Sequence, residues 1–541
     1  MHDKQNTCVV RALTQMSTLA SRGTFLKAVV AVGAIALAAG FSISWVVQAE
    51  AATNATVTLS PQGVAFPPPE YAGLSFWDHP HNLPPDFPEK CYNGVRGRDA
   101  YELLAAIYGG RPSDYWAPGI WEWNETLRKW RARPLSTSDP EWIGYPPSYG
   151  VPDDDVTDHN YPTGHSVITL RAGQYQLGQG VISLGKYGLP DGSYITRNSI
   201  TIKGAGKDKT FLNGDYARDS LYAWTDDEDA VTVTIRDLSI SSSVGTMASV
   251  GFTLSNVRVD IPFIAHTSPQ FATFGFKNDS IAVWIDNSPV PDHSIGDVNI
   301  SSCEFIADWN AVWISALDYV SPSSRNLTIT GNTSFTGSSG ILIMPGWGDY
   351  GPIDGYANKV VTNNHITLRR SYSDEEARGY EGILCDTSGP ALIANNDITV
   401  ENNAPNVWGI EIGTIFPAID IVVKNNRIYQ TFSGLIGGGG GGFGITVGGY
   451  WGQYTASHDN ILIGNNLSNV RPSLGAYYLG QDAYDNIIAG NAGTVGYDGE
   501  PSPIPNNFIT GLTPMAGAPH IGPQMVDALQ WKLNLLMGKD E

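Results

Sequence analysis

Two short motifs alternate along the second half of the chain. One is a small residue followed by alternating apolar positions, as in Ala311-Val312-Trp313-Ile314. The other runs through a polar turn, as in Val361-Thr362-Asn363-Asn364-His365-Ile366. The central positions of the first motif are residues 284, 313, 342, 384, 411, 446 and 478. The turn positions of the second motif interleave with them one for one: Cys303, Asn332, Asn364, Asn396, Asn426, Asn466 and Asn491. Two series with the same count indicate successive coils of a repeat protein.

The fold follows from what one such coil lacks. A coil of about 30 residues with short strands, polar turns and no helix cannot bury its own apolar face, so neighbouring coils must stack. This predicts an all-β solenoid, a parallel β-helix, over residues 166–511. Asparagine suits the turns because its short side chain tolerates the left-handed backbone region and stacked amides can hydrogen-bond between coils. We therefore interpret Asn364, Asn396 and Asn426 as structural.

The N-terminal segment, residues 1–51, is predicted to be a signal peptide or a membrane anchor. Basic residues precede an apolar run without charges from about Ala28 to Val47, and small residues at Ala49 and Ala51 suit cleavage. The alternative is an uncleaved anchor, because about 20 apolar residues can span a bilayer. Both interpretations place the rest of the chain outside the cytoplasm, secreted or at the cell surface, with membrane contact only through this segment.

The stack is expected to be flanked by two further segments. Residues 52–165 are rich in Pro and Trp and predict an N-terminal cap or accessory region, with helices near Arg98–Tyr108 and Trp121–Trp130. Residues 512–541 form a tail in which Pro523–Met537 has apolar positions at helical spacing, which predicts a short C-terminal helix closing the last coil.

Charge and cysteine content exclude several classes of function. A formal net charge of −21 with no basic stripe argues against nucleic acid as a partner. An acidic surface suits solubility, calcium capture or neutral glycans, and does not choose among them. Beyond the N-terminal segment only Cys91, Cys303 and Cys385 remain, an odd number far apart, so no disulfide framework is implied.

The start of the stack resembles a known superfamily. Ser166-Val167-Ile168-Thr169-Leu170-Arg171-Ala172-Gly173, followed by Ile200-Thr201-Ile202-Lys203-Gly204-Ala205-Gly206, is similar to the opening coils of pectin-lyase-like right-handed parallel β-helix proteins. The resemblance covers about residues 166–511 and implies a right-handed helix with a glycan-related role. That superfamily includes lyases, hydrolases, uronate epimerases and non-catalytic surface proteins. The Asn-Thr-Asp and Arg-x-Lys motifs of its polygalacturonase-like members are absent, and Gly164-His165-Ser166 precedes the first coil, so the resemblance transfers no catalytic residue.

Strand alternation assigns one column of side chains to the outside of the stack. The positions flanking it are apolar in every coil, which places Cys385 in the core as a buried thiol. The outward column comprises Trp284, Trp313, Leu342, Leu384, Glu411, Thr446 and Tyr478. We predict that its aromatic rings bind sugar, helped by Trp347, Tyr350, Tyr450 and Trp451 in nearby turns. The alternative is that loops or the N-terminal region cover the strip.

Asp386 and Glu411 are the candidate catalytic residues. One coil and two residues apart, their Cβ atoms are expected about 8 Å from each other, near the spacing of inverting glycosidases. The alternative is a pair of solvated surface acids. A uronate lyase or epimerase would need a cation or calcium and a base. The nearby turns offer His365, Arg369, Arg370 and Arg378.

No cofactor is certain from the sequence, and calcium is the candidate. Oxygen-rich clusters that suit it occur at Asp153–Asp158 and Asp226–Asp229, although neither has the spacing of a known calcium loop. Acidic loops without a metal are the alternative.

The sequence favours an exported β-helix that binds extracellular polysaccharide, as a surface or adhesive protein. One alternative is a polysaccharide-cleaving enzyme, either an inverting glycoside hydrolase or a uronate lyase or epimerase. Another is a structural component of the cell envelope. The sequence does not specify an oligomeric state.

Overall fold

The computed structural model describes twenty-six segments of the chain. They are residues 55–61, 90–94, 98–115, 118–124, 129–134, 159–178, 182–188, 194–214, 219–225, 231–247, 250–261, 281–286, 296–307, 310–315, 325–337, 339–344, 358–369, 380–401, 406–414, 416–433, 441–448, 455–470, 476–489, 494–497, 507–510 and 512–514. Contacts divide the chain into two units, Met1–Ala51 and Ala52–Glu541, and every described residue belongs to the second. The predicted signal or anchor, and the helix expected at Pro523–Met537, therefore lie outside the described residues. Within the described residues, no helix is both long and apolar enough to cross a membrane.

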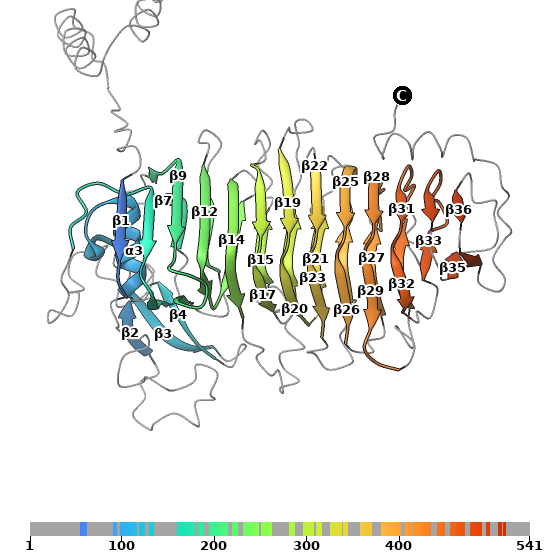
Figure 1. Ribbon diagram of the computed structural model, residues 1–541. Helices are drawn as coiled ribbons and strands as arrows, with labels where there is room; N and C mark the ends of the chain where they lie inside the picture. Colours follow the sequence, from blue (N-terminus) through green and yellow to red (C-terminus); the bar gives the residue numbers. More distant parts are fainter. Residues whose placement is uncertain are drawn as a thin grey trace, which may run out of the picture. The chain divides into compact units, whose positions relative to one another are not determined.

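The second unit is built from two long sheets whose strands stack coil upon coil (Figure 1). One sheet has 21 strands in two parallel paths, and the other has 13 strands. Every pairing between successive coils in the described residues is parallel. Crossovers between parallel strands of one sheet take a right-handed sense. The predicted right-handed parallel β-helix is confirmed.

The first path of the 21-stranded sheet consists of β1 (Thr56–Leu59), β5 (Val167–Leu170), β9 (Ser199–Lys203), β12 (Thr232–Ile240), β14 (Gly251–Asp260), β16 (Val298–Ser301), β19 (Asn326–Thr330), β22 (Asn358–Thr362), β25 (Ser388–Ala394), β28 (Ile419–Lys424), β31 (Ile461–Ile463), β34 (Ile487–Ala489) and β36 (Phe508–Thr510). The second path adds β6 (Gly173–Gly178), β10 (Thr210–Gly214), β17 (Glu304–Ala307), β20 (Thr333–Thr336), β23 (His365–Leu368), β26 (Asp397–Val400), β29 (Arg427–Gln430) and β32 (Asn466–Asn469). The 13-stranded sheet consists of β7 (Ile182–Gly188), β8 (Tyr194–Thr196), β11 (Asp219–Trp224), β13 (Ser243–Met247), β15 (Ile281–Asp286), β18 (Asn310–Ser315), β21 (Ser339–Met344), β24 (Tyr380–Cys385), β27 (Asn406–Ile412), β30 (Gly441–Val447), β33 (Tyr477–Leu479), β35 (Thr494–Tyr497) and β37 (Thr513–Pro514).

In the turn between the two paths of the 21-stranded sheet, two successive residues have different structural roles. The first residue takes a left-handed backbone, as at Asn363 with φ 58° and Asn395 with φ 56°. The second residue is a buried asparagine whose amide nitrogen donates to the amide oxygen of the next coil. These bonds are 2.9 Å long from Asn332 to Asn364, from Asn364 to Asn396 and from Asn396 to Asn426, and the last step, from Asn426 to Asn465, is 3.0 Å. The predicted structural role of the turn asparagines is thus confirmed.

The asparagine series predicted from the sequence is off by one residue at its C-terminal end. The residue that continues the ladder is Asn465, because Gly464 takes the left-handed position before it with φ 66°. Asn466, the predicted residue, is exposed at the start of β32, and Asn491 lies outside the described residues. A second amide ladder, which the sequence reading missed, runs at another corner from Asn460 to Asn486 and on to Asn507.

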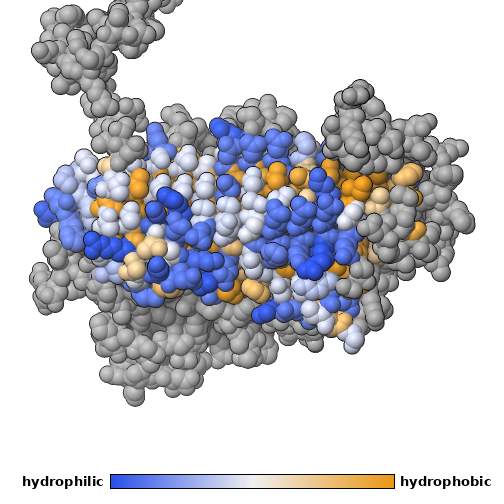
Figure 2. Space-filling model, in the orientation of Figure 1, coloured by the Kyte–Doolittle hydropathy of each residue, from blue (hydrophilic) through white to orange (hydrophobic). Residues whose placement is uncertain are grey.

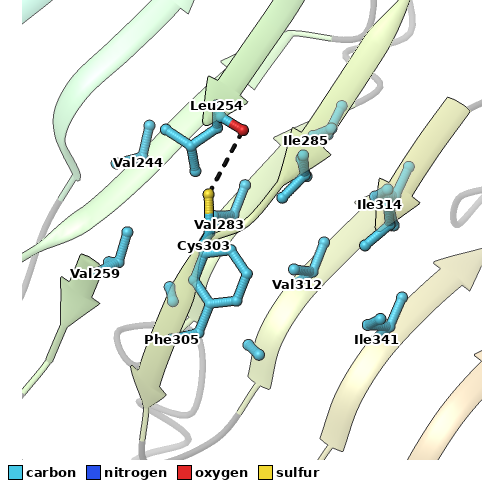
Figure 3. Packing of buried hydrophobic residues seen from close by; sticks show 14 of the residues in the cluster. Val244, Leu254, Val259, Val283, Ile285, Cys303, Phe305, Val312, Ile314 and Ile341 are labelled. Atoms are coloured by element: carbon cyan, nitrogen blue, oxygen red, sulfur yellow. Dashed lines mark hydrogen bonds between the residues drawn. The ribbon is translucent and has the colours of Figure 1, made fainter. Parts of the chain in front are cut away.

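Apolar columns from both sheets fill the interior of the coils (Figure 3). Val283 and Ile410, two of the predicted inward residues, are completely buried. Cys303 and Cys385 are buried and form no disulfide, as predicted for Cys385. The Cys303 thiol donates to the Leu254 carbonyl at 3.5 Å, and burial raises its pKa to about 12.

Close packing against the core explains why the first motif often begins with glycine. A Cβ atom on Gly382 would lie 2.4 Å from the carbonyl oxygen of Gly409 and 2.8 Å from methyl groups of Ile398. Gly340, Gly409 and Gly444 face the same two obstacles, a backbone carbonyl of the next coil and a branched side chain of the core. These glycines let the 13-stranded sheet approach the core side chains of β23, β26, β29 and β32 closely.

The N-terminal helix is confirmed, and α3 covers Arg98–Tyr108. Its residues from Ala100 to Tyr108 are buried in the same core as the first coils, and it contacts β5, β6 and β7. Arg197 donates to the carbonyl oxygens of Ile107 and Tyr108 at 2.9 Å, which satisfies the C-terminal end of the helix. A short 3-10 turn, η3 (Pro112–Tyr115), follows.

The second predicted helix, at Trp121–Trp130, is wrong. This region forms β3 (Pro118–Asn124) and β4 (Lys129–Pro134), which make an antiparallel sheet with β2 (Lys90–Gly94). Trp123 pairs with Trp130 across the two strands. Aromatic residues favour such cross-strand pairs, and Trp121 and Trp123 already follow the two-residue period of a strand. Upstream of the predicted stack, β1 pairs in register with β5, so the parallel sheet also uses residues before 166.

Candidate functional site

The outward column of the 13-stranded sheet is in register, as predicted. We call it the outer column, and in the structure it also includes Tyr222 and Gly245. Its successive pairs are Tyr222 with Gly245, Gly245 with Trp284, Trp284 with Trp313, Trp313 with Leu342, Leu342 with Leu384, Leu384 with Glu411, Glu411 with Thr446 and Thr446 with Tyr478.

Only the N-terminal part of the outer column is open to solvent. Tyr222, Trp284 and Trp313 are half-buried. The ring centroids of Tyr222 and Trp284 lie 6.2 Å apart although they are two coils apart, because Gly245 between them has no side chain. The column therefore carries a run of aromatic rings over its first coils.

From Leu342 onward the outer column is buried, so the prediction of a continuous exposed strip is wrong for this part. Leu342, Met344 and Leu384 form an apolar cluster against which Trp313 packs. Trp408, Phe443 and Tyr478 form another. Both clusters are separate from the core inside the coils. The covered alternative holds for these coils. Trp347, Tyr350, Tyr450 and Trp451, the other predicted sugar-binding residues, lie outside the described residues.

The two predicted catalytic acids are buried, and the alternative of two solvated surface acids is wrong. Asp386 is 0 % exposed and Glu411 is 2 % exposed. Asp386 directly follows β24, where its backbone N–H donates to the Ile343 carbonyl at 2.9 Å. Its carboxylate accepts a hydrogen bond of 3.3 Å from the Phe416 backbone N–H. Glu411 lies on the next strand, β27, and accepts a hydrogen bond from the Thr414 hydroxyl.

A third acid, Glu381, belongs to the same site and was missed from the sequence. Strict alternation back from Ile383 points Glu381 into the core. The chain instead places Gly382 against the core, which shifts the phase by one residue, and Glu381 pairs with Trp408 of the outer cluster. The Ser339 hydroxyl donates to the Glu381 carboxylate. The glycine of the motif was the signal that could have shown this break in alternation.

These positions define a second outer column, consisting of Asn310, Ser339, Glu381, Trp408 and Phe443. Asn310 has an unusual environment. Its side chain is completely buried, and neither its amide nitrogen nor its amide oxygen has a hydrogen-bond partner among the described residues. In the outer column, the buried hydroxyl of Thr446 also lacks a hydrogen-bond partner within the part of the chain that the structure describes. Unpaired buried polar atoms are costly, so both groups need an explanation.

The surroundings of two of these acids raise their pKa values. Burial raises the pKa of Glu411 well above its usual value, and the neighbouring charges of Glu381 and Asp386 raise it further, against the hydrogen bond from Thr414. Burial also raises the pKa of Glu381, against the hydrogen bond from Ser339. A carboxyl group that keeps its proton near neutral pH can act as a general acid, while an ionised neighbour can act as a base.

The cations considered for a lyase or epimerase do not join this site where they are described. His365 and Arg369 lie at β23, on the 21-stranded sheet. His365 faces Asp397 at 3.8 Å, and the Arg369 guanidinium pairs with Glu401 at 2.7 Å. Arg370 and Arg378 lie outside the described residues.

The described segments contain no group of three or more His, Cys, Asp or Glu residues that could hold a metal ion such as calcium. The acidic clusters at Asp153–Asp158 and Asp226–Asp229 lie outside them.

No protein-family model matches the chain. No curated protein matches it either. Among solved structures, it is similar to the Azotobacter vinelandii mannuronan C-5 epimerase AlgE4 A-module, with 13 % identity over 66 % of this chain and 91 % of that chain and a TM-score of 0.24. The AlgE6 A-module of the same organism gives 12 % identity, the same coverage and a TM-score of 0.23. The resemblance to pectin-lyase-like proteins is confirmed for the fold, which the stacked parallel sheets show directly.

Proposed function

We propose that this protein is secreted or held at the cell surface and binds an extracellular polysaccharide along the outer face of the 13-stranded sheet. The observation that carries the proposal is the half-buried pair Trp284 and Trp313, in register on adjacent coils. Adjacent strands are about 4.8 Å apart, so two such rings form a platform along the stack. The apolar faces of sugar rings pack well on aromatic side chains.

The aromatic run extends beyond this pair. Tyr222 adds a third ring at 6.2 Å from Trp284. A repeat protein presents equivalent positions at regular intervals, which suits a ligand that is itself a repeating polymer. The acidic chain as a whole, at −21, matches an extracellular partner better than a nucleic acid.

Affinity electrophoresis against a panel of soluble polysaccharides tests the proposal. The double variant Trp284→Ala/Trp313→Ala is expected to weaken retardation by the bound glycan at least about tenfold, because each stacked aromatic contributes on the order of 1 kcal/mol beyond its burial. Phe335→Ala is the matched control, since Phe335 is a half-buried aromatic of β20 on the other sheet. Equal loss in both variants, or no retardation of the wild-type chain by any glycan, would refute binding at this face.

A second candidate function is cleavage of the bound glycan, favoured by the buried acids. Glu411, whose pKa is raised by burial, would donate a proton to the leaving oxygen, and Asp386 or Glu381 would activate water. Glu411→Gln is expected to abolish the release of reducing ends. Glu401→Gln, at an exposed acid after β26, is the control and should leave it unchanged. Persistent turnover in Glu411→Gln would remove this acid from the mechanism, and unsaturated products would indicate a lyase instead.

A further inference from the structure

We infer that the polysaccharide is uncharged, and that Asn310 supplies hydrogen bonds to its hydroxyl groups. This inference rests on the proposed function and adds the chemical class of the ligand. It follows from two independent features: the described strands of the 13-stranded sheet contain one basic residue, Lys186, and they carry unpaired neutral polar groups at Asn310 and Thr446.

The 13-stranded sheet is almost free of positive charge. In its described strands the one basic residue is Lys186, whereas Asp219, Asp286, Glu381 and Glu411 are acidic and Asp386 follows β24 directly. Lys186 lies on β7 next to the N-terminal edge of the sheet, with its ammonium 4.4 Å from the Tyr194 ring centroid and 5.6 Å from that of Trp224. Six strand pairings separate β7 from β24, which corresponds to about 29 Å.

The basic residues of the stack gather instead on the 21-stranded sheet. There Arg258 pairs with Glu304 at 2.9 Å, and Arg427 pairs with Asp397. These cations already have acidic partners. Figure 2 shows hydrophilic residues gathered over the middle coils on the face in view. The two sheets thus differ in charge, and the sheet that carries the aromatic platform is the one whose described strands contain a single basic residue, Lys186.

A uronate polymer would bring a negative charge on every sugar to this face. An ionised carboxylate about 8 Å from a uronate, at an effective dielectric constant of about 20, weakens binding on the order of 30-fold. A uronate ligand would need a cation at each subsite to offset this, as recognition of carboxylates normally uses arginine or lysine. A neutral glycan has no such requirement.

The neutral polar groups of the same face match hydroxyls. Asn310 precedes Trp313 by three residues on β18, about 10 Å along the strand. Its amide offers a donor and an acceptor, both unpaired, and two neighbouring sugar hydroxyls can supply the complementary acceptor and donor. Ser339 lies in register with Asn310 on the next coil, and the unpaired hydroxyl of Thr446 lies in register with Glu411. The cost of leaving Asn310 unpaired is explained if a bound ligand completes its hydrogen bonds.

Glycan pairs that differ in charge alone test the ligand class. Polygalacturonate and mannuronan would each be compared with its carboxyl-reduced form, using the full chain and calorimetric titration at low and at high salt. We expect the reduced form of at least one pair to bind at least tenfold more tightly at low salt. We also expect added salt to narrow the difference, because screening weakens repulsion between partly exposed charges. Tighter binding of a uronan, lost in Lys186→Ala, would overturn the inference while leaving the proposed function standing. Absence of binding to any glycan, charged or neutral, would overturn both.

Asn310→Leu separates a ligand-binding role from a structural one. Leucine has a similar shape and no unpaired polar atoms, so the variant should unfold at an equal or higher temperature while binding the neutral glycan at least about tenfold more weakly. Unchanged affinity would show that Asn310 does not contact the ligand, and a lower unfolding temperature would show that its amide is already satisfied within the folded chain. Asn326→Leu, at an exposed asparagine of β19, is the matched control for binding.

Discussion

Replacing Asn396 by alanine tests the amide ladder, the feature that keeps successive coils in register. The Asn396 side chain takes part in four hydrogen bonds of 2.9–3.0 Å, and it is 1 % exposed. The substitution leaves two donors of Asn364, its backbone N–H and one amide hydrogen, without their acceptor. At about 1–3 kcal/mol for each unsatisfied buried group, we expect the free energy of unfolding to fall by about 2–6 kcal/mol.

Asn395, the preceding residue, is the matched control because it shares the turn but not the ladder. It is exposed and takes φ 56°, so Asn395→Ala should cost only about 1–2 kcal/mol for the left-handed backbone. Asn395→Gly should be close to neutral, since Gly331 and Gly464 fill the same position in other coils.

The assay is urea unfolding followed by tryptophan fluorescence and by circular dichroism. Repeat proteins can lose cooperativity, so the two transitions must coincide before midpoints are converted to free energies. A cost for Asn396→Ala no larger than that for Asn395→Ala would refute a stabilising role of the ladder.

Two further predictions concern stability. Burial and neighbouring acids raise the pKa of Glu411 in the folded state, so its contribution to folding stability is fully present below its unfolded pKa and is lost as pH rises through the raised value. Glu411→Gln should therefore reduce the loss of stability above about pH 4.5. An unchanged profile of unfolding midpoint against pH would contradict this. Gly382→Ala should lower the free energy of unfolding by about 1–3 kcal/mol, because its Cβ would lie 2.4 Å from the Gly409 carbonyl oxygen. Gly206→Ala is the control for backbone strain, because its added Cβ meets nothing nearer than 3.8 Å while its φ is +138°. An equal loss of stability in both variants would contradict the packing argument.

The outer column could be predicted because a stacked coil fixes register by its hydrophobic pattern alone. Seven predicted positions, from Trp284 to Tyr478, pair in the predicted order. Glu381 could not be placed by the same rule, because Gly382 turns toward the core and shifts the phase of the strand. Burial of Glu411 could not be predicted from the sequence either, because strand alternation shows which side a residue faces but not what packs over that side.

The remaining errors have local causes. The helix predicted at Trp121–Trp130 is wrong because aromatic residues at these positions fit either period over so short a segment. Asn465 and Asn466 are adjacent asparagines, and the choice between them depends on the left-handed Gly464. Such one-residue choices are made by backbone geometry, which composition does not reveal.

The amide ladder has a direction. Every ladder amide between Asn332 and Asn426 donates toward the C-terminal neighbour and accepts from the N-terminal one. Aligned dipoles of this kind polarise one another, so each added link strengthens those already made. The ladder repeats every 32 residues at Asn332, Asn364 and Asn396. If one such segment were duplicated in tandem, the amide of the upstream coil would donate to an equivalent asparagine in the inserted coil, in the same orientation. A solenoid of this design can therefore lengthen by whole coils, and its ligand-facing surface can grow, without any orphaned amide at the junction.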